Sequence, residues 1–309
     1  MTTPTRVLVT GAAGQVGVDL MDVLAGQTPL GGDVTFHPDG RAIAPDEFEV
    51  IGLTHHDLDI TDEDHVHRAI TTARPDVIVH LAAYTAVDRA ETDADTCFAV
   101  NDLATKFLSD AAAAVGAHFI SVSTDYVFDG NKGDSYVEED ETNPLSVYGT
   151  SKRDGERRCR REDTIVRTSW VMGVRGKNVV HVIADRALSG QQVKFVTDQT
   201  GTVTAAADLA RALVCFVRTR PGGVWHVANS GTTTWFDVAD FAGRTLGRGD
   251  DFATGILTQD LSPAPLAHRP TRSDLNTTKF ASAFAPLPFW QEGVGRLLAD
   301  RPRRDEVGA

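Results

Sequence analysis

Three side chains in the middle of the chain have the chemistry needed to reduce a carbonyl group. Tyr148 and Lys152 are four residues apart, so on a helix they project from one face. A phenol has an ordinary pKa of about 10, and a neighbouring ammonium group brings that pKa toward neutrality. Thr124 follows shortly after an apolar run that ends at Val122, and its hydroxyl can hydrogen-bond the same carbonyl oxygen that Tyr148 protonates. We therefore predict Thr124, Tyr148 and Lys152 as catalytic residues.

A glycine-rich segment near the N-terminus, Gly11-x-x-Gly14-x-x-Gly17, predicts a dinucleotide site. It lies between a predicted strand at residues 6–10 and a segment whose apolar residues have helical spacing. Glycines at these positions allow a tight turn, close approach of the backbone to a pyrophosphate, and close packing of helix on strand. The N-terminus of the helix then offers free N–H groups to the phosphates.

The pattern of apolar segments predicts the elements that position these residues. Strands alternate with helical segments such as residues 62–72 and 93–115, which is typical of parallel strands joined by crossover helices. We therefore predict an α/β fold with a doubly wound, Rossmann-like parallel sheet. A strand that ends in Thr124 places the Thr124 hydroxyl at the carboxyl edge of the sheet, which is where ligands bind in such folds. The predicted strands are residues 6–10, 49–53, 77–81, 118–122, 164–168, 193–196 and 224–228.

The same pattern predicts two parts of unequal size. Residues 1–170 are expected to form the dinucleotide-binding domain, to which residues 193–228 return. Residues 171–192 and 229–309 lose the regular alternation, and the second of these segments is rich in proline. We predict that they form a smaller C-terminal substrate-binding lobe. Residues 26–47 make a long connection, in which residues 33–36 and 41–44 flank a His-Pro-Asp-Gly turn and predict a small hairpin.

Composition excludes several classes of function. The 309 residues include 30 Lys and Arg against 43 Asp and Glu, a net charge of −13 that argues against binding to a nucleic-acid backbone. No apolar run approaches the ~18 residues of a membrane-spanning helix, and no leader segment is recognisable before the first strand. Three scattered cysteines indicate neither a disulfide framework nor a zinc site. We expect a cytoplasmic protein with no nucleic-acid or membrane partner and no metal.

Several longer motifs resemble one known family. Residues 82–88 read Ala-Ala-Tyr-Thr-Ala-Val-Asp, residues 123–128 read Ser-Thr-Asp-Tyr-Val-Phe, and residues 169–171 read Ser-Trp-Val. With the glycine-rich loop, the Tyr148–Lys152 pair and an Arg-Pro-x-x-Ser-x-Leu segment from Arg269, they span nearly the whole chain. The chain resembles the extended short-chain dehydrogenases/reductases, and within them the dTDP-4-dehydrorhamnose reductases.

This resemblance implies a reaction and a set of site residues. The reaction is NAD(P)H-dependent reduction of the C4 ketone of a nucleotide-linked 4-keto-6-deoxy sugar, as in dTDP-rhamnose biosynthesis, by a homodimer. It assigns catalysis to Thr124, Tyr148 and Lys152. The implied cofactor-binding residues are Gly11, Gly14, Gln15, Val16, Gly17, Asp59, Ile60, Ala82, Ala83, Tyr148 and Lys152. The implied substrate-binding residues are Thr85, Val87, Tyr126, Trp170, Asn178 and Arg269.

The residues leave some alternatives open. Met172 and Val203 replace an aromatic residue and a proline that are usual in the subgroup, so another dTDP-4-keto-deoxysugar is a second candidate substrate. Relatives that dehydrate sugar nucleotides carry Thr-Asp-Glu where this chain has Thr124-Asp125-Tyr126, which favours simple reduction. Other relatives are non-catalytic regulatory subunits of methionine adenosyltransferase. Some relatives bind magnesium, and Asp19 matches one of their ligand positions, but we predict no metal.

The end of the second predicted strand bears on the choice of cofactor. NAD selection normally uses an Asp or Glu there, which binds the ribose 2′-hydroxyl and repels a 2′-phosphate. Here the strand is followed by Thr54, His55 and His56, with no acidic residue before Asp57. We therefore expect NADPH to be preferred, with NADH also accepted.

Overall fold

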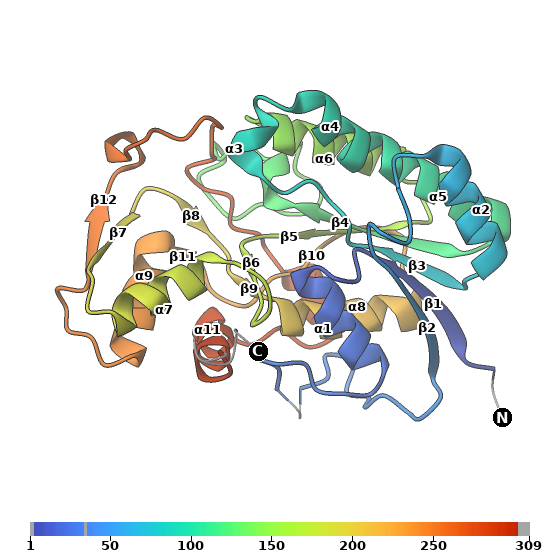
Figure 1. Cartoon of the computed structure of the whole chain (residues 1–309), viewed down its shortest axis with the longest axis horizontal. Helices are drawn as coiled ribbons and strands as arrows, with labels where there is room; N and C mark the ends of the chain where they lie inside the picture. Colours follow the sequence, from blue (N-terminus) through green and yellow to red (C-terminus); the bar gives the residue numbers. More distant parts are fainter. Residues whose placement is uncertain (1–2, 34–35, 302–309) are drawn as a thin grey trace.

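The computed structural model describes residues 3–33 and 36–301, and its centre is a parallel sheet (Figure 1). The strand order is β10-β5-β4-β3-β1-β2, which confirms the predicted doubly wound arrangement. The chain crosses from β2 back past β1 to β3, so the switch point of the sheet lies between β1 and β3, beside the glycine-rich loop that follows β1. The strands are β1 (Thr5–Thr10), β2 (Phe48–Leu53), β3 (Val77–His80), β4 (His118–Thr124), β5 (Thr164–Thr168) and β10 (Gly223–His226).

Helices cover both faces of this sheet, so its central strands are apolar on both sides (Figure 1). Val7 and Val9 of β1 pack toward α1 (Gln15–Leu24) and α8 (Ala206–Thr219). Leu8, between them, points to the opposite face, toward α2 (Glu63–Ala73) and α5 (Ala104–Val115). On that second face also lie α4 (Ala94–Phe98) and α6 (Val147–Arg158), with the one-turn helix α3 (Val87–Ala90) at its edge. The single helix predicted over residues 93–115 is instead α4 and α5 joined by a π-helical turn (Ala99–Leu103).

The smaller lobe lies at one end of the sheet and has its own apolar core (Figure 1). Its helices are α7 (Val179–Leu188), α9 (Trp235–Thr245) and α11 (Trp290–Ala299), while α10 (Thr278–Ala283) packs under β10. Its two-stranded sheets pair β6 (Val171–Met172) with β9 (Thr204–Ala205), β8 (Thr200–Gly201) with β11 (Thr233–Thr234), and β7 (Val193–Val196) with β12 (Ala253–Ile256).

The pairing of β7 differs from the sequence prediction. Residues 193–228 were expected to return to the dinucleotide-binding domain, and α8 and β10 do so. Strand β7 instead pairs in parallel with β12 of the lobe, because an apolar run predicts a strand without indicating its partner. The assignment of domain boundaries stays a prediction. In the part of the chain that the structure describes, no helix is long and apolar enough to cross a membrane.

The long connection of residues 26–47 is held by a buried arginine on α8. The hairpin predicted there is wrong, because residues 41–44 form no strand, whereas Val34 and Thr35 lie outside the described residues. The predicted turn is present, closed by the Gly40 N–H donating to the His37 carbonyl at 2.8 Å. The Arg218 guanidinium donates to Asp39 (2.6 Å) and Glu47 (2.7 and 2.9 Å), and its side chain is only 6% exposed.

Replacing Arg218 with Ala should therefore lower the free energy of unfolding by about 3 kcal/mol, because it leaves two shielded carboxylates without their partner. Chemical denaturation at pH 7 measures this. The matched control is Arg244→Ala, whose side chain is 57% exposed and pairs with Asp240, and it should cost about 0.5 kcal/mol or less. Equal losses in the two variants would contradict the role given to Arg218.

Candidate active site

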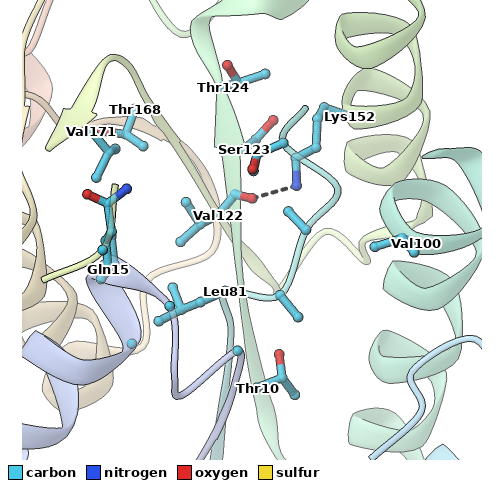
Figure 2. Close-up of a pocket in the computed structure, with 18 of the residues that line it drawn as sticks. Thr10, Gln15, Leu81, Val100, Val122, Ser123, Thr124, Lys152, Thr168 and Val171 are labelled. Atoms are coloured by element: carbon cyan, nitrogen blue, oxygen red, sulfur yellow. Dashed lines mark hydrogen bonds between the residues drawn. The ribbon is translucent and has the colours of Figure 1, made fainter. Parts of the chain in front are cut away.

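A cavity of about 1080 Å³ lies at the carboxyl ends of the central strands (Figure 2), and residues of the smaller lobe such as Trp235 help to line it. Its wall contains residues from the glycine-rich loop, from the ends of β3 and β4, and from α6. All residues predicted to be catalytic or to bind the cofactor line this one cavity: Gly11, Gly14, Gln15, Val16, Gly17, Asp59, Ile60, Ala82, Ala83, Thr124, Tyr148 and Lys152.

The glycine-rich loop has the shape that a dinucleotide phosphate needs. Gly11 has φ +70°, and a Cβ there would lie 2.6 Å from the backbone nitrogen of Ala82. A Cβ on Gly17 would lie 2.2 Å from the Gly11 carbonyl oxygen, so α1 packs directly on the loop. Gly14 is the N-cap of α1 and supplies no side chain to its first N–H groups. These groups and the bare backbone fit a pyrophosphate at the helix N-terminus.

The local fold of α6 brings Tyr148 and Lys152 to the end of β4. The Ser146 side chain caps the helix by accepting a hydrogen bond from the Gly149 N–H at 3.1 Å. Lys152 is one turn after Tyr148, and its Nζ donates to the Val122 carbonyl at 2.8 Å, as Figure 2 shows. Thr124 is the last residue of the same strand. The three predicted catalytic side chains therefore lie on two adjoining elements.

Burial shifts the pKa values of these groups in opposite directions. It raises the pKa of Tyr148, with a smaller opposing effect from hydrogen bonding to Thr124. It lowers the pKa of Lys152 to about 8, against an upward contribution from Glu156. At neutral pH Tyr148 is thus a neutral phenol, able to donate a proton, and Lys152 remains largely an ammonium group. This protonation state is the one that a carbonyl reduction requires.

Four of the six predicted substrate residues also line the cavity: Thr85, Val87, Tyr126 and Trp170. Trp170 has φ +43° and stacks on Trp235, with ring centroids 4.0 Å apart and planes at 14°. Trp235 lines the cavity as well and was missed by the sequence analysis. The signal for it was weak, a Thr-Thr-Thr-Trp segment in which Thr234 begins α9 with a capping box.

Asn178 and Arg269 lie outside the cavity lining. Asn178 caps α7 by accepting from the His181 N–H at 3.2 Å, and its Nδ2 donates to the Gln15 amide oxygen at 3.1 Å. Arg269 pairs with Asp88 at 2.6 Å, behind Tyr126. Their assignment to substrate binding stays a prediction. Among residues 3–33 and 36–301, no group of three His, Cys, Asp or Glu side chains is placed to hold a metal ion.

The turn after β2 contributes Thr54 and His55 to the cavity. The Thr54 hydroxyl donates to the Asp57 carboxylate at 2.7 Å, and this bond lowers the pKa of Asp57. A negative charge therefore lies closer to the end of β2 than the sequence suggested, because the turn folds Asp57 back onto Thr54. His55 and His56 pack against each other with ring centroids 3.7 Å apart.

Comparison with known proteins decides the family. The family model described as the RmlD substrate binding domain matches residues 39–302. The chain belongs to this family. The dTDP-4-dehydrorhamnose reductase of Streptomyces griseus is 38% identical over 299 residues, which cover 94% of this chain and 91% of that enzyme. The resemblance inferred from the sequence motifs is thereby confirmed.

Two further relatives extend this result. A crystal structure of dTDP-4-dehydrorhamnose reductase from Bacillus anthracis in complex with NADP has a TM-score of 0.84 and 29% identity, and the match covers 96% of this chain and 99% of that one. A Streptomyces antibioticus protein described as a probable dTDP-4,6-dihydroxy-2-methyloxan-3-one 4-ketoreductase is 33% identical, covering 96% of this chain and 95% of its own. The present chain is an NAD(P)-dependent oxidoreductase of the dTDP-4-dehydrorhamnose reductase type, as the sequence predicted.

The packing of the glycine-rich loop leads to a test of cofactor binding. Gly17→Ala should raise the Kd for NADPH about tenfold or more, because the new methyl group displaces the Gly11 turn, where we expect the cofactor pyrophosphate to bind. Quenching of tryptophan fluorescence measures this Kd, and circular dichroism verifies folding. The control is Gly295→Ala on α11, where a Cβ meets no atom within 4 Å. A Kd equal to that of the unmodified protein would contradict the assignment.

Proposed function

We propose that this protein reduces dTDP-4-dehydro-L-rhamnose to dTDP-L-rhamnose, with NADPH as the preferred cofactor. Family membership already indicates that the protein reduces a 4-keto sugar. The observation that supports this reaction is the neutral, half-buried phenol of Tyr148, which lies beside Thr124 and shares the cavity of the glycine-rich loop with Lys152.

The three catalytic side chains then have different roles. The nicotinamide, when bound, supplies hydride to the sugar C4. Tyr148 donates its phenolic proton to the oxygen that becomes the C4 hydroxyl, and Thr124 orients that oxygen by a hydrogen bond. The Lys152 ammonium group stabilises the phenolate left on Tyr148 and would also hold the nicotinamide ribose.

The choice of dTDP-4-dehydro-L-rhamnose as the substrate rests on the residues predicted to surround the sugar. Met172 and Val203, which depart from the subgroup pattern, are both buried and outside the cavity lining. Thr85, Val87 and Tyr126 follow the pattern and line the cavity. A reductase for another dTDP-4-keto-deoxysugar is the second candidate, supported by the ketoreductase relative of Streptomyces antibioticus. The homodimer and the cytoplasmic location stay predictions.

The substrate is tested with a panel of dTDP-4-keto sugars and NADPH, following loss of cofactor absorbance and identifying each product. The highest kcat/KM is expected for dTDP-4-dehydro-L-rhamnose. A higher value for another member of the panel would favour the second candidate. If the protein reduces none of these sugars and captures a methionine adenosyltransferase, the result would support the regulatory role instead.

In the same assay Tyr148→Phe should lower kcat by about 10³-fold or more, because the proton donor is lost. Its Kd for NADPH should stay within threefold of the unmodified value. Tyr136→Phe is the matched control, since that phenol bonds Asp129 away from the cavity. Near-normal turnover by Tyr148→Phe would refute the mechanism.

NADPH should be preferred over NADH by about tenfold or less in kcat/KM, since a weak contact with the 2′-phosphate is worth ~1.4 kcal/mol. The preference is limited because the Asp57 carboxylate lies beside Thr54 and repels a 2′-phosphate. Measuring kcat/KM for both cofactors at pH 7 checks this. A clear preference for NADH would refute it.

A further inference from the structure

One carboxyl group in the cavity wall has no part in the reaction as derived above. Asp125 is the first residue of the short helical turn η2 (Asp125–Val127), directly after β4, and it is 1% exposed. Its Oδ1 accepts a hydrogen bond from the Thr124 hydroxyl at 3.1 Å. Its Oδ2 accepts one from the Ser273 hydroxyl at 2.5 Å. The carboxyl group therefore joins a predicted catalytic residue to a residue far along the chain.

The position of Ser273 is fixed from its other side. Ser273 lies between β12 and α10, and its N–H donates to the Thr200 carbonyl at 2.9 Å. The Thr200 N–H in turn donates to the Thr271 carbonyl at 2.8 Å. These backbone bonds tie the segment to β8, so Ser273 presents its hydroxyl to Asp125 from a rigid support.

The Thr124 hydroxyl cannot donate to both the Asp125 carboxylate and a substrate ketone. A hydroxyl group has a single proton to donate. The Thr124 oxygen already accepts the Tyr126 N–H at 3.2 Å, and its proton goes to the Asp125 carboxylate. While this bond persists, Thr124 cannot donate to a ketone oxygen of the substrate. A proton on Asp125 removes the conflict, because a carboxylic acid can itself donate to the Thr124 oxygen.

The surroundings of Asp125 favour such a proton. The titratable groups that face it are the phenols of Tyr126 on its own turn and Tyr148 on α6, both held neutral by burial. Burial raises the pKa of Asp125 to about 7, against the opposing bonds from Ser273 and Thr124.

The charged groups that lie beyond these two phenols are each hydrogen-bonded to partners other than Asp125. Arg269 and Asp88 bind each other behind Tyr126. Next to Ser273, the Asp274 carboxylate accepts from Arg272 at 2.7 Å. Lys152 on α6 directs its ammonium group to the Val122 carbonyl.

We propose that protonated Asp125 is a positioning residue that turns the Thr124 hydroxyl proton toward the ketone oxygen of the substrate. The ionised form holds that proton itself and leaves the ketone oxygen with Tyr148 alone. Ser273 sets the balance between the two forms, because its hydrogen bond stabilises the carboxylate. This inference rests on the proposed reduction and adds a second proton-bearing group to it.

The consequence is a pH dependence with two separable causes. Reduction should slow as the pH rises through the titration of Asp125, near 7, and further as Lys152 loses its proton near 8. In Asp125→Asn, the amide N–H₂ donates to Thr124 and its oxygen accepts from Ser273, which mimics the protonated acid at every pH.

The experiment measures kcat/KM for the best sugar of the panel between pH 6 and pH 9, at saturating NADPH. The apparent pKa of the decline should move from about 7 in the unmodified protein to about 8 in Asp125→Asn, where Lys152 alone titrates. The control is Asp250→Asn, whose carboxyl is 86% exposed and whose profile should match the unmodified protein. An unchanged profile in Asp125→Asn would overturn the proposal, as would a loss above hundredfold at every pH.

Ser273→Ala provides a second test that does not alter the carboxyl group. Loss of its hydrogen bond should raise the apparent pKa of the decline above the unmodified value, whereas a merely structural role would lower the rate equally at all pH values. This variant decides the matter if Asp125→Asn fails to fold, and an unmoved profile counts against the proposal. Failure of the unmodified protein to reduce any sugar would refute the proposed function instead.

Discussion

Direct contact between backbones places the catalytic helix. A Cβ on Gly149 of α6 would lie 2.2 Å from the Tyr126 carbonyl oxygen, and one on Gly155 would lie 2.2 Å from the carbonyl oxygen of Asn101. The helix is therefore pressed against the turn after β4 on one side and against the π-helical turn on the other. At this separation the Lys152 side chain reaches the Val122 carbonyl, and Tyr148 reaches the level of Thr124. The arrangement of the predicted catalytic side chains depends on these two glycines.

The same close packing excludes water and thereby sets the charges of the site. Desolvation raises the pKa of Tyr148 and of Asp125 and lowers that of Lys152, so all three move toward their neutral forms. A phenol that keeps its proton suits reduction, in which the enzyme gives a proton away. For the reverse oxidation the site would first have to ionise Tyr148, which a bound cationic nicotinamide favours.

Local patterns predicted the parts of this site, and long-range contacts account for what they missed. Thr124, Tyr148 and Lys152 follow from residue type and spacing, and the parallel strands follow from apolar runs of the right length. The partner of β7 could not be predicted, because β12 lies some sixty residues further along the chain and its sequence is only weakly apolar. Asp125 belongs to the Ser-Thr-Asp-Tyr-Val-Phe motif, but its contact with Ser273 could not be predicted, because the two residues are 148 positions apart in the sequence.

The stacked rings of Trp170 and Trp235 belong to different parts of the chain. Trp170 follows β5 of the large sheet, whereas Trp235 begins α9 of the smaller lobe. This part of the cavity wall is thus assembled from two segments of the chain, which meet where the two ring centroids lie 4.0 Å apart. A chimera that joins the sheet of one relative to the lobe of another would keep the glycine-rich loop of the first relative. It would have to form a new contact between the two tryptophan positions. This aromatic part of the cavity wall is therefore a property of the pairing of the two parts and cannot be transplanted with either one alone.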